Sequence, residues 1–292
     1  MNYHIIDGKA TSLKVQKEIA SEVKNRVKSG GKRPHLAAVL IGNDPASKAY
    51  VGHKVKACNN VGFESSLVER GSDITEEELL KIVKNLNHDD SIDGFIVQLP
   101  LPSHIDPVKV IEAVSPDKDV DGFHPVNIGK MSLGLPTFKP ATPAGVMTLL
   151  EFHEIKTEGL HAVVVGRSDI VGNPMSALLR SNTEPGNCTV TQCHSRTKDL
   201  KSHTLQADLL ITAIGQPHFI TADMVKDGAI IVDVGINRIS DPSRKSGSRL
   251  TGDVDFENVA PKCSWITPVP GGVGPMTIAT LLQNTLKAAN GK

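Results

Sequence analysis

Residues 163–176, with the sequence VVVGRSDIVGNPMS, have the composition of a phosphate-binding turn. A β-branched run leads into a turn that contains Gly166 and Gly172, and Asn173-Pro174 then indicates a helix with proline at its first position. The N-terminus of such a helix offers backbone N–H groups and a positive dipole end, which suit a pyrophosphate. Because the glycine spacing departs from the usual GxGxxG pattern, the prediction also needs support from the residues after the next strand.

Those residues distinguish NADP from NAD. An NAD-binding unit usually places an acid after its second strand to hold the ribose 2′-hydroxyl. Here the predicted strand at 189–192 is followed by Ser195 and Arg196, and Arg167 lies in the glycine turn itself. A hydroxyl and two guanidinium groups would meet a 2′-phosphate with hydrogen bonds and positive charge. One arginine alone would more often be a solvated surface residue, but the three groups together predict NADP.

Four polar side chains in the first half of the chain could hold a substrate and move a proton. Tyr50 and Lys54 are four residues apart on a predicted helix, so both project from one face. Such a pair is often only a surface feature. Gln98, however, comes directly after the apolar run 95–97 at the usual binding edge of a parallel sheet, and Asp121 lies in a glycine-containing loop. We therefore expect a cleft at this edge with a lysine available for acid–base chemistry.

The segment 268–277, PVPGGVGPMT, is the third unusual stretch. Three glycines and three prolines in ten residues are too costly for an ordinary loop. Because the segment ends at a predicted helix N-terminus, it can bring backbone close to a planar or anionic ligand. A hinge between domains is an equally compatible interpretation.

Taken together, these motifs resemble the bifunctional methylenetetrahydrofolate dehydrogenase/methenyltetrahydrofolate cyclohydrolase family along the whole chain. The segments that carry the resemblance are Ala46-Ser47-x-x-Tyr50-Val51-x-x-Lys54, Val97–Pro102, Lys118–Gly122, Gly166-Arg167-Ser168 with Val171-Gly172-x-Pro174, Gly252-Asp253-Val254 and Pro268–Thr277. One departure is Ala141, since the family linker often reads Pro-Cys-Thr-Pro.

The resemblance also implies site residues. For the folate substrate they are Tyr50, Lys54, Val97, Gln98, Leu99, Asp121, Pro270, Gly271, Gly272, Val273 and Gly274, with Tyr50, Lys54, Gln98 and Asp121 carrying the catalysis. For NADP they are Gly166, Arg167, Ser168, Ser195 and Ile236, and Arg196 joins them because of its charge.

The implied chemistry has two steps. Hydride transfer from 5,10-methylenetetrahydrofolate to NADP⁺ mainly requires positioning. Hydrolysis of the methenyl product to 10-formyltetrahydrofolate requires proton transfer, for which Lys54 is the candidate. Two positive charges at ~4 Å repel by about 4 kcal/mol at an effective dielectric of about 20, and burial acts in the same direction, so we expect Lys54 to be neutral beside the methenyl cation. Gln98 would orient the amine, Tyr50 would pack against the substrate, and Asp121 would anchor N–H donors of the pterin ring.

Composition excludes several other classes of function. Lys+Arg and Asp+Glu each total 32 in 292 residues, so no basic field exists to hold nucleic acid or an anionic membrane. No apolar run approaches the ~20 residues of a membrane span, and the N-terminus lacks a signal pattern. The four cysteines and eleven histidines show no metal-binding spacing. We expect a cytoplasmic protein with free thiols and no metal.

Alternating strand and helix patterns predict an α/β fold with two domains. We expect an N-terminal α/β catalytic domain that binds folate (1–141), to which the last helix (275–292) returns, and a C-terminal Rossmann-type NADP-binding domain (142–274). The predicted helices are 13–28, 45–60, 75–87, 142–152 and 276–289, and the predicted strands are 35–41, 94–99, 162–165, 189–192, 208–213 and 229–234. Residues 115–140 are expected to be irregular.

Three other functions remain open from the sequence. One is an NADP oxidoreductase of the shikimate dehydrogenase kind, which also pairs a lysine and an aspartate outside its nucleotide domain. Another is a nucleotide-binding module without turnover, and the third is a dehydrogenase without cyclohydrolase activity. Family resemblance further implies a homodimer, formed through the nucleotide domain.

Overall fold

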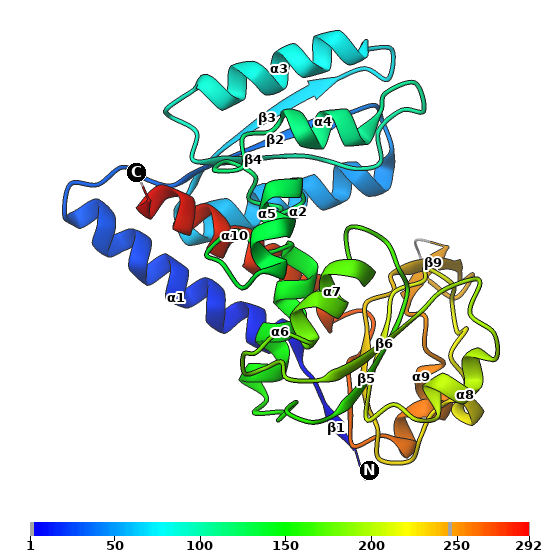
Figure 1. The fold of residues 1–292 in the computed structure, drawn as a ribbon. Coiled ribbons are helices and arrows are strands. Elements are labelled where there is room, and N and C mark those ends of the chain that lie inside the picture. The colour runs from blue at the N-terminus through cyan, green and yellow to red at the C-terminus, as the bar shows by residue number, and fades with distance from the viewer. Residues whose placement is uncertain (1–2, 245–246, 292) are drawn as a thin grey trace. The chain divides into compact units, whose positions relative to one another are not determined.

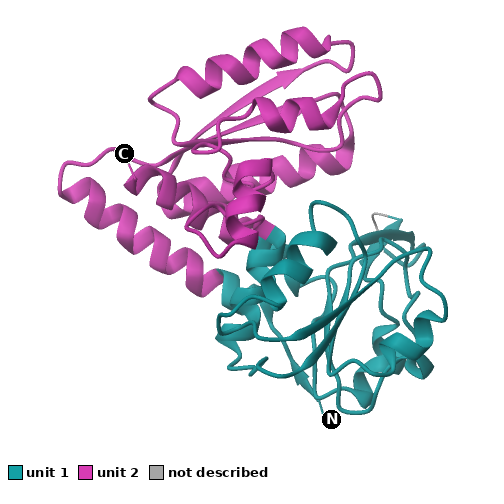
Figure 2. Ribbon diagram, viewed as in Figure 1, with its two compact units in different colours: residues 1–12, 142–277 teal, residues 13–141, 278–292 magenta. Residues whose placement is uncertain are grey.

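The computed structural model describes residues 3–244 and 247–291 of the chain. It divides into two compact units, coloured separately in Figure 2. The residues up to Ser12 and Thr142–Thr277 form the six-stranded unit, and Leu13–Ala141 with the residues from Ile278 onward form the three-stranded unit. The last helix therefore returns to the N-terminal half of the chain, as predicted.

The three-stranded unit has a parallel sheet with strand order β3-β2-β4 (Figure 1). Its strands are β2 (His35–Ile41), β3 (Glu64–Arg70) and β4 (Gly94–Val97). Every residue of β2 after His35 is buried, which explains its unbroken apolar sequence. By contrast, β3 lies at the sheet edge and reads ESSLVER, so it has no apolar alternation and was not predicted.

Helices surround this sheet, and their ends follow local capping chemistry. They are α1 (Gly8–Lys28), α2 (Pro45–Val61), α3 (Glu76–His88), α4 (Pro107–Ala113), α5 (Pro125–Ser132) and α10 (Val273–Asn290). Asp44 caps α2 by accepting the Ser47 N–H, and Gly62 ends it with φ 82°. Thr75 caps the start of α3 in a capping box, and the helix lies within one residue of the predicted range 75–87. The stretch 115–140 is not wholly irregular, because it contains α5.

The end of α10 packs along α1 within the three-stranded unit (Figure 1). The Arg26 guanidinium donates to the Asn290 side chain and to the Ala289 carbonyl, and Asn290 donates to Glu22. Further along α10, the Asn284 amide donates to the backbone carbonyls of Val120 and Lys139. The C-terminal helix therefore supports the residue before Asp121 and the segment that ends at Lys139.

The six-stranded unit has a fully parallel sheet with order β1-β11-β8-β7-β5-β6. Its strands are β1 (His4–Ile5), β5 (His161–Val165), β6 (Thr189–Cys193), β7 (Leu209–Thr212), β8 (Ile230–Asp233) and β11 (Trp265–Ile266). The four longer strands were predicted within one or two residues, whereas β1 and β11 are too short to give a sequence signal.

The N-terminal residues require a correction to the predicted domain boundary. Residues 1–12 were expected in the folate-binding domain, but β1 pairs with β11 and the Ile6 N–H donates to the Ile266 carbonyl. A Cβ on Gly8 would lie 1.7 Å from the Gly272 carbonyl oxygen, so α1 begins in close contact with the glycine-rich segment. Backbone pairing and this close approach place the first residues in the six-stranded unit.

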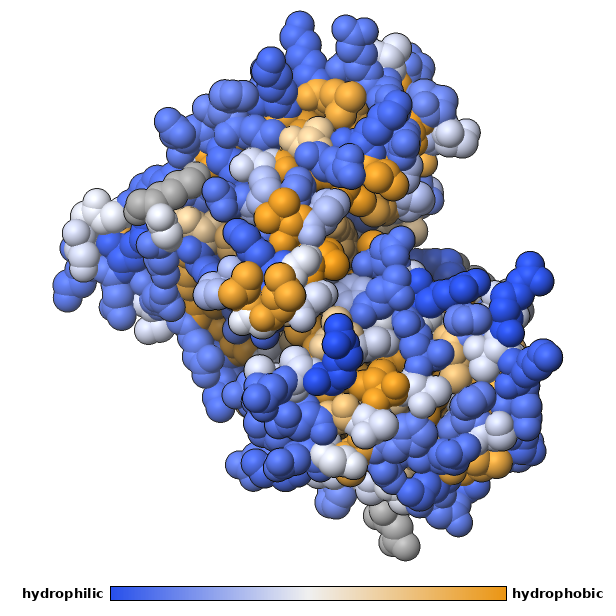
Figure 3. Space-filling view, in the orientation of Figure 1, coloured by the Kyte–Doolittle hydropathy of each residue, from blue (hydrophilic) through white to orange (hydrophobic). Residues whose placement is uncertain are grey.

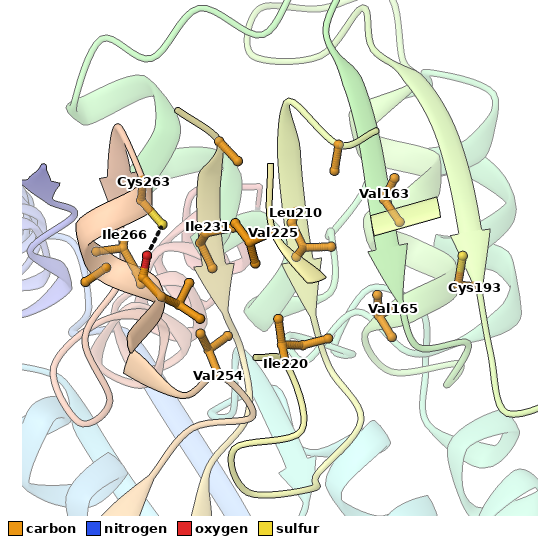
Figure 4. Close-up of a cluster of buried hydrophobic side chains, with 14 residues drawn as sticks. Val163, Val165, Cys193, Leu210, Ile220, Val225, Ile231, Val254, Cys263 and Ile266 are labelled. Carbon is orange, nitrogen blue, oxygen red and sulfur yellow. Dashed lines mark hydrogen bonds between the residues drawn. The ribbon is translucent and has the colours of Figure 1, made fainter. Parts of the chain in front are cut away.

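Alternate residues of the central strands form the hydrophobic core on one face of this sheet (Figure 4). The labelled side chains of Val163, Val165, Leu210, Ile231 and Ile266 come from four adjacent strands and are all at most 2 % exposed. Residues between them in the sequence are buried as well, which is typical of a parallel sheet covered on both faces.

The remaining elements of this unit lie outside the sheet. They are helices α6 (Ala141–Phe152), α7 (Gly172–Leu179), α8 (Leu200–Thr204) and α9 (Phe256–Val259), and the hairpin of β9 (Asn237–Ser240) and β10 (Ser248–Thr251). Both α7 and α10 begin two or three residues earlier than predicted, because proline is tolerated throughout the first helical turn and not only at its start. Helix α6 begins within one residue of the predicted start at 142, and the Thr142 hydroxyl hydrogen-bonds to that of Thr277.

The surface and the thiols agree with the composition. Figure 3 shows a mainly hydrophilic face with separate apolar groups, and exposed apolar side chains include Val126, Leu133 and Leu135 on α5 and the turn after it. Within 3–244 and 247–291, no helix combines the length and apolar character needed to cross a membrane. All four cysteines are free and buried.

Candidate functional site

Lys54 is the centre of the site in the three-stranded unit. It lies on α2 and is only 4 % exposed. Its Nζ donates to Gln98 Oε1 at 3.3 Å and lies 4.7 Å from the centroid of the Tyr50 ring. The predicted helix face and strand end therefore do bring these three side chains together.

Gln98 is fixed in an orientation that turns its acceptor toward the lysine. Its backbone N–H donates to the Val39 carbonyl at 2.9 Å, which continues the pairing of β4 with β2. Its side-chain Nε2 donates to the Leu99 carbonyl at 2.6 Å. With the amide hydrogens directed to Leu99, the Oε1 atom accepts from Lys54.

The loop that carries Asp121 lies alongside β4. The Phe95 N–H donates to the Lys118 carbonyl at 3.0 Å, and Asp119 forms a parallel bridge with Phe95. Gly94 permits this approach, since a Cβ there would lie 2.2 Å from a Val120 methyl. Asp121 is thus presented beside the end of the strand that leads to Gln98.

Asp119 and Lys118 fix the conformation of this loop through hydrogen bonds to backbone groups. Neither residue was given a role in the sequence analysis. The Asp119 carboxylate accepts from the backbone N–H of Gly122 and His124 and from the Asn127 amide, at 2.7–3.1 Å. The buried Lys118 ammonium donates to two carbonyls at the end of α3. The KDVDG motif contained the signal, but a side chain that binds its own backbone cannot be told from a ligand-binding one by sequence alone.

Burial controls the protonation of Lys54 and Asp121. Loss of hydration lowers the pKa of Lys54, opposed by the attraction of the Asp121 carboxylate. Burial raises the pKa of Asp121, opposed by the Lys54 ammonium and reinforced by Asp119. The environment therefore favours a neutral amine more than water does. Burial also raises the pKa of the neighbouring Cys58 thiol to about 12, so Cys58 is an inert core residue.

A pocket opens beside this cluster. Three predicted site residues, Val97, Leu99 and Asp121, line it together with Phe95, Ile96, Val110, Ile111, Val114, Asp119 and Phe123. The lining is mostly apolar and includes two aspartates, of which Asp119 is already hydrogen-bonded within its own loop and Asp121 is the one available to a ligand.

In the glycine turn of the six-stranded unit, Ser168 accepts hydrogen bonds from the backbone N–H groups at the start of α7. The Ser168 hydroxyl accepts from the N–H of Val171 and Gly172, and its carbonyl accepts from Asn173. The amides at the start of α7 are thus already bonded, which differs from the predicted open helix terminus. Within the described residues, the backbone N–H groups of 167–170 find no acceptor.

The turn must contain its two glycines. Gly166 has φ 140°, and a Cβ on Gly172 would lie 2.4 Å from the Gly166 carbonyl oxygen. Arg167 and Ser168 are exposed at this turn.

Ser195 and Arg196 are exposed after β6, where the Arg196 N–H donates to His194 Nδ1. Exposed guanidiniums and hydroxyls after β5 and β6 fit a phosphorylated dinucleotide, and residues 194–196, where an NAD-binding unit usually places an acid, contain no carboxylate.

The predicted folate residues Pro270–Gly274 belong to the six-stranded unit. The Gly271 carbonyl accepts from Lys9, and Gly272 lies so close to Thr267 that a Cβ would be 2.7 Å from the threonine Cβ. Gly274 faces the half-exposed Ile236, a predicted NADP residue, whose Cδ1 would lie 3.3 Å from an added Cβ. Their relation to Lys54 stays a prediction.

Asp233, at the end of β8, is a buried carboxylate that sequence reasoning overlooked. Its Oδ1 accepts from the Gly235 and Asp253 N–H groups and the Thr212 hydroxyl, and its Oδ2 accepts from Val254. Burial raises its pKa to about 6, despite these hydrogen bonds. No cluster of three or more potential metal ligands occurs in the described part of the chain.

Fold and site define an α/β protein with a Rossmann-type dinucleotide unit joined to a second unit that carries a buried lysine. Family models for the tetrahydrofolate dehydrogenase/cyclohydrolase catalytic domain and its NAD(P)-binding domain match residues 6–121 and 140–292. The chain belongs to this tetrahydrofolate dehydrogenase/cyclohydrolase family.

Relatives resemble the chain over its full length. The bifunctional protein FolD of Cytophaga hutchinsonii is 62 % identical, with 98 % of each chain covered. The crystal structure of the bifunctional FolD enzyme of Campylobacter jejuni is 49 % identical, covers 99 % of each chain and superposes with a TM-score of 0.93. The Trypanosoma brucei enzyme, solved with NADP cofactor and an inhibitor, is 37 % identical over 99 % of this chain and 98 % of its own, with a TM-score of 0.93.

Shikimate dehydrogenase from Thermus thermophilus is a much more distant likeness. It is 17 % identical, with a TM-score of 0.52 over 87 % of this chain and 98 % of its own, which shows a shared fold alone.

Replacing Gly122 tests how tightly the Asp121 loop is built. Gly122 has φ 78°, and a Cβ there would lie 2.5 Å from the Lys139 carbonyl carbon, whereas Gly134 has φ 70° with open space around it. Gly134→Ala should cost about 1 kcal/mol from backbone strain alone, and Gly122→Ala at least about twice as much. Urea unfolding of both variants measures the difference. Equal losses would show that the loop yields easily.

Asp233→Asn tests the raised pKa. The native carboxyl keeps its proton to about pH 6, whereas in the unfolded chain it loses it near 3.8. The stability that this proton contributes is therefore present below about pH 4 and lost as the pH rises through 6, amounting to roughly 3 kcal/mol at ~1.4 kcal/mol per unit.

The stability difference between wild type and Asp233→Asn should shrink by that order between about pH 4 and pH 7. Unfolding at both pH values measures it, with the exposed Glu257→Gln as control. A difference that stays constant with pH would contradict the raised pKa.

Proposed function

We propose that this protein oxidises 5,10-methylenetetrahydrofolate to 5,10-methenyltetrahydrofolate with NADP⁺ and hydrolyses that product to 10-formyltetrahydrofolate. The observation that carries the proposal is the buried Lys54 amine, hydrogen-bonded to Gln98 and electrostatically coupled to Asp121, in a member of this family. A spectrophotometric assay with methylenetetrahydrofolate and NADP⁺ tests it directly. Absence of both methenyl formation and coenzyme reduction would refute it.

For the oxidation, the protein's contribution is binding and orientation. NADP⁺, when bound, supplies the hydride acceptor. Arg167, Ser195 and Arg196 would hold its 2′-phosphate through charge-assisted hydrogen bonds, and the turn at Ser168 would face its pyrophosphate. The Tyr50 ring would pack against the folate, and the carboxyl of Asp121 would bond its N–H donors. No strong base is required, because the two nitrogens that flank the reacting carbon stabilise the cation that forms.

For the hydrolysis, Lys54 acts as the proton carrier. The neutral amine accepts a proton from the water that attacks the methenyl carbon, and the resulting ammonium is stabilised by Gln98 Oε1 and the Asp121 carboxylate. The same ammonium then returns the proton to the ring nitrogen whose bond to that carbon breaks, and the remaining hydroxyl proton leaves to solvent as the formyl carbonyl forms. Burial serves this role because it lowers the pKa of the lysine toward the working pH.

Lys54→Met separates the two steps. It removes the proton carrier but keeps an apolar stem of similar length, so cyclohydrolase activity should fall by about 10²–10⁴-fold while much of the dehydrogenase activity remains. Lys54→Arg should lose cyclohydrolase activity too, since a guanidinium stays charged. The matched control is Lys56→Met, an exposed lysine on the same helix. Equal loss of both activities with folate binding intact would refute the division of labour.

The arginines after β5 and β6 should set the preference for NADP⁺. Loss of both Arg167 and Arg196 should raise the KM for NADP⁺ by about 10–100-fold and leave the KM for NAD⁺ nearly unchanged, since only the 2′-phosphate loses partners. Arg180→Ala is the control, because this arginine is exposed at the far end of α7. A parallel rise in both KM values would contradict the assignment.

The proposal includes a homodimer in a reducing cytoplasm. What supports the compartment is the set of four buried, free cysteines. What supports association through the six-stranded unit is β6, the last strand of its sheet, because an open strand edge is a surface on which a second copy can pair. Light scattering of the purified protein measures the oligomeric state.

A further inference from the structure

Asp253 is a buried carboxylate whose acceptor positions are all used by two loops. It is 0 % exposed. Its Oδ2 accepts from the backbone N–H of Ile214 at 2.8 Å and of Gly215 at 3.1 Å, and its Oδ1 accepts from Gln216 N–H and the Asn237 side-chain amide, both at 2.9 Å. Four donors around one carboxylate make a rigid junction.

The two loops that meet at Asp253 lie at the carboxyl edge of the parallel sheet. Residues 214–216 come shortly after the end of β7. Asn237 is the first residue of β9, shortly after the end of β8. β7 pairs with β5, and the Gly166 turn approaches it so closely that a Cβ on Gly166 would lie 2.5 Å from the Ala213 carbonyl oxygen. Asp253 therefore joins the segments next to the coenzyme turn.

The backbone of Asp253 is fixed by a second carboxylate, that of Asp233. The backbone N–H of Asp253 and that of Val254 donate to Asp233. Two glycines make room for the pair: a Cβ on Gly235 would lie 2.3 Å from the Asp253 carboxyl carbon, and one on Gly252 would lie 1.9 Å from Asp233 Oδ2. Because of this close packing, the Asp253 side chain can adopt only the orientation described above.

Strand order indicates which part of the coenzyme these loops face. The order β8-β7-β5-β6 places the 2′-phosphate residues Ser195 and Arg196 after β6 and the phosphate turn after β5. A dinucleotide that runs from β6 across β5 extends next over β7 and β8, which carry the segments that Asp253 joins. The exposed side chain of Ile236 lies in one of those segments.

We infer that Asp253 is a positioning residue for the nicotinamide half of NADP⁺. Its carboxylate sets the backbone of 214–216 and of 236–237 so that the redox end of the coenzyme meets a preformed surface. This inference rests on the proposed function, because it takes the bound coenzyme to be NADP⁺.

The Asp253→Asn variant keeps the size of the side chain but turns one acceptor into a donor that faces N–H groups. The KM for NADP⁺ in the dehydrogenase assay should rise about tenfold or more, with a lower kcat. Cyclohydrolase activity on methenyltetrahydrofolate, which needs no coenzyme, should stay within about twofold. The control is Asp255→Asn, two residues away and half-buried, whose carboxylate accepts from the Asn258 side-chain amide.

A second readout separates positioning from a general structural role. Binding of 2′,5′-ADP, which carries the 2′-phosphate but no nicotinamide, should be unchanged in Asp253→Asn, while NADP⁺ binding weakens. Equal weakening of both ligands, or cyclohydrolase loss in step with dehydrogenase loss, would overturn the inference. A wild-type protein that fails to bind NADP⁺ would instead refute the proposed function.

The Asn237→Ala variant tests the same inference if the Asp253→Asn variant does not fold. It removes one of the four donors and leaves the carboxylate in place. The KM for NADP⁺ should rise by a smaller factor in the same assay, again with cyclohydrolase activity and 2′,5′-ADP binding unchanged. An unchanged KM would contradict the inference.

Discussion

The chemistry of this protein depends on keeping one amine out of water. A buried ammonium is costly unless it is bonded, and Lys54 is given few partners: the Gln98 oxygen, the face of Tyr50 and the field of Asp121. These contacts compensate the charged form only in part, so the neutral form becomes accessible. A helix, the end of a strand and a loop bring these partners together around the nitrogen and exclude water from it.

Both units organise their functional loops in the same physical way. A buried aspartate turns its carboxylate onto backbone N–H groups and so fixes a loop that presents other residues: Asp119 does this for the segment of Asp121, and Asp253 does it for the segments after β7 and β8. Glycines are needed in both arrangements: Gly235 leaves room for the Asp253 carboxylate, and Gly122 allows the Asp121 loop to pack against Lys139. Functional loops are thereby rigid without being covered.

Sequence patterns predicted the elements that carry strong local signals. The apolar run of β2 and the helix that starts after Thr75 lie where expected, and so does the Tyr50–Lys54 helix face. The edge strand β3 is polar, and β1 is two residues long, so both are defined by backbone pairing with distant residues. Asp253 appeared in a motif without a role, because its four donors come from residues up to 39 positions away.

The central claim concerns the protonation of a single side chain, so titrating that side chain tests it most directly. NMR of the protein labelled at the lysine Cε follows each amine through its own transition. The account predicts that Lys54 titrates below the ordinary lysine value of 10.5. A Lys54 resonance that titrates at or above 10.5 would contradict it.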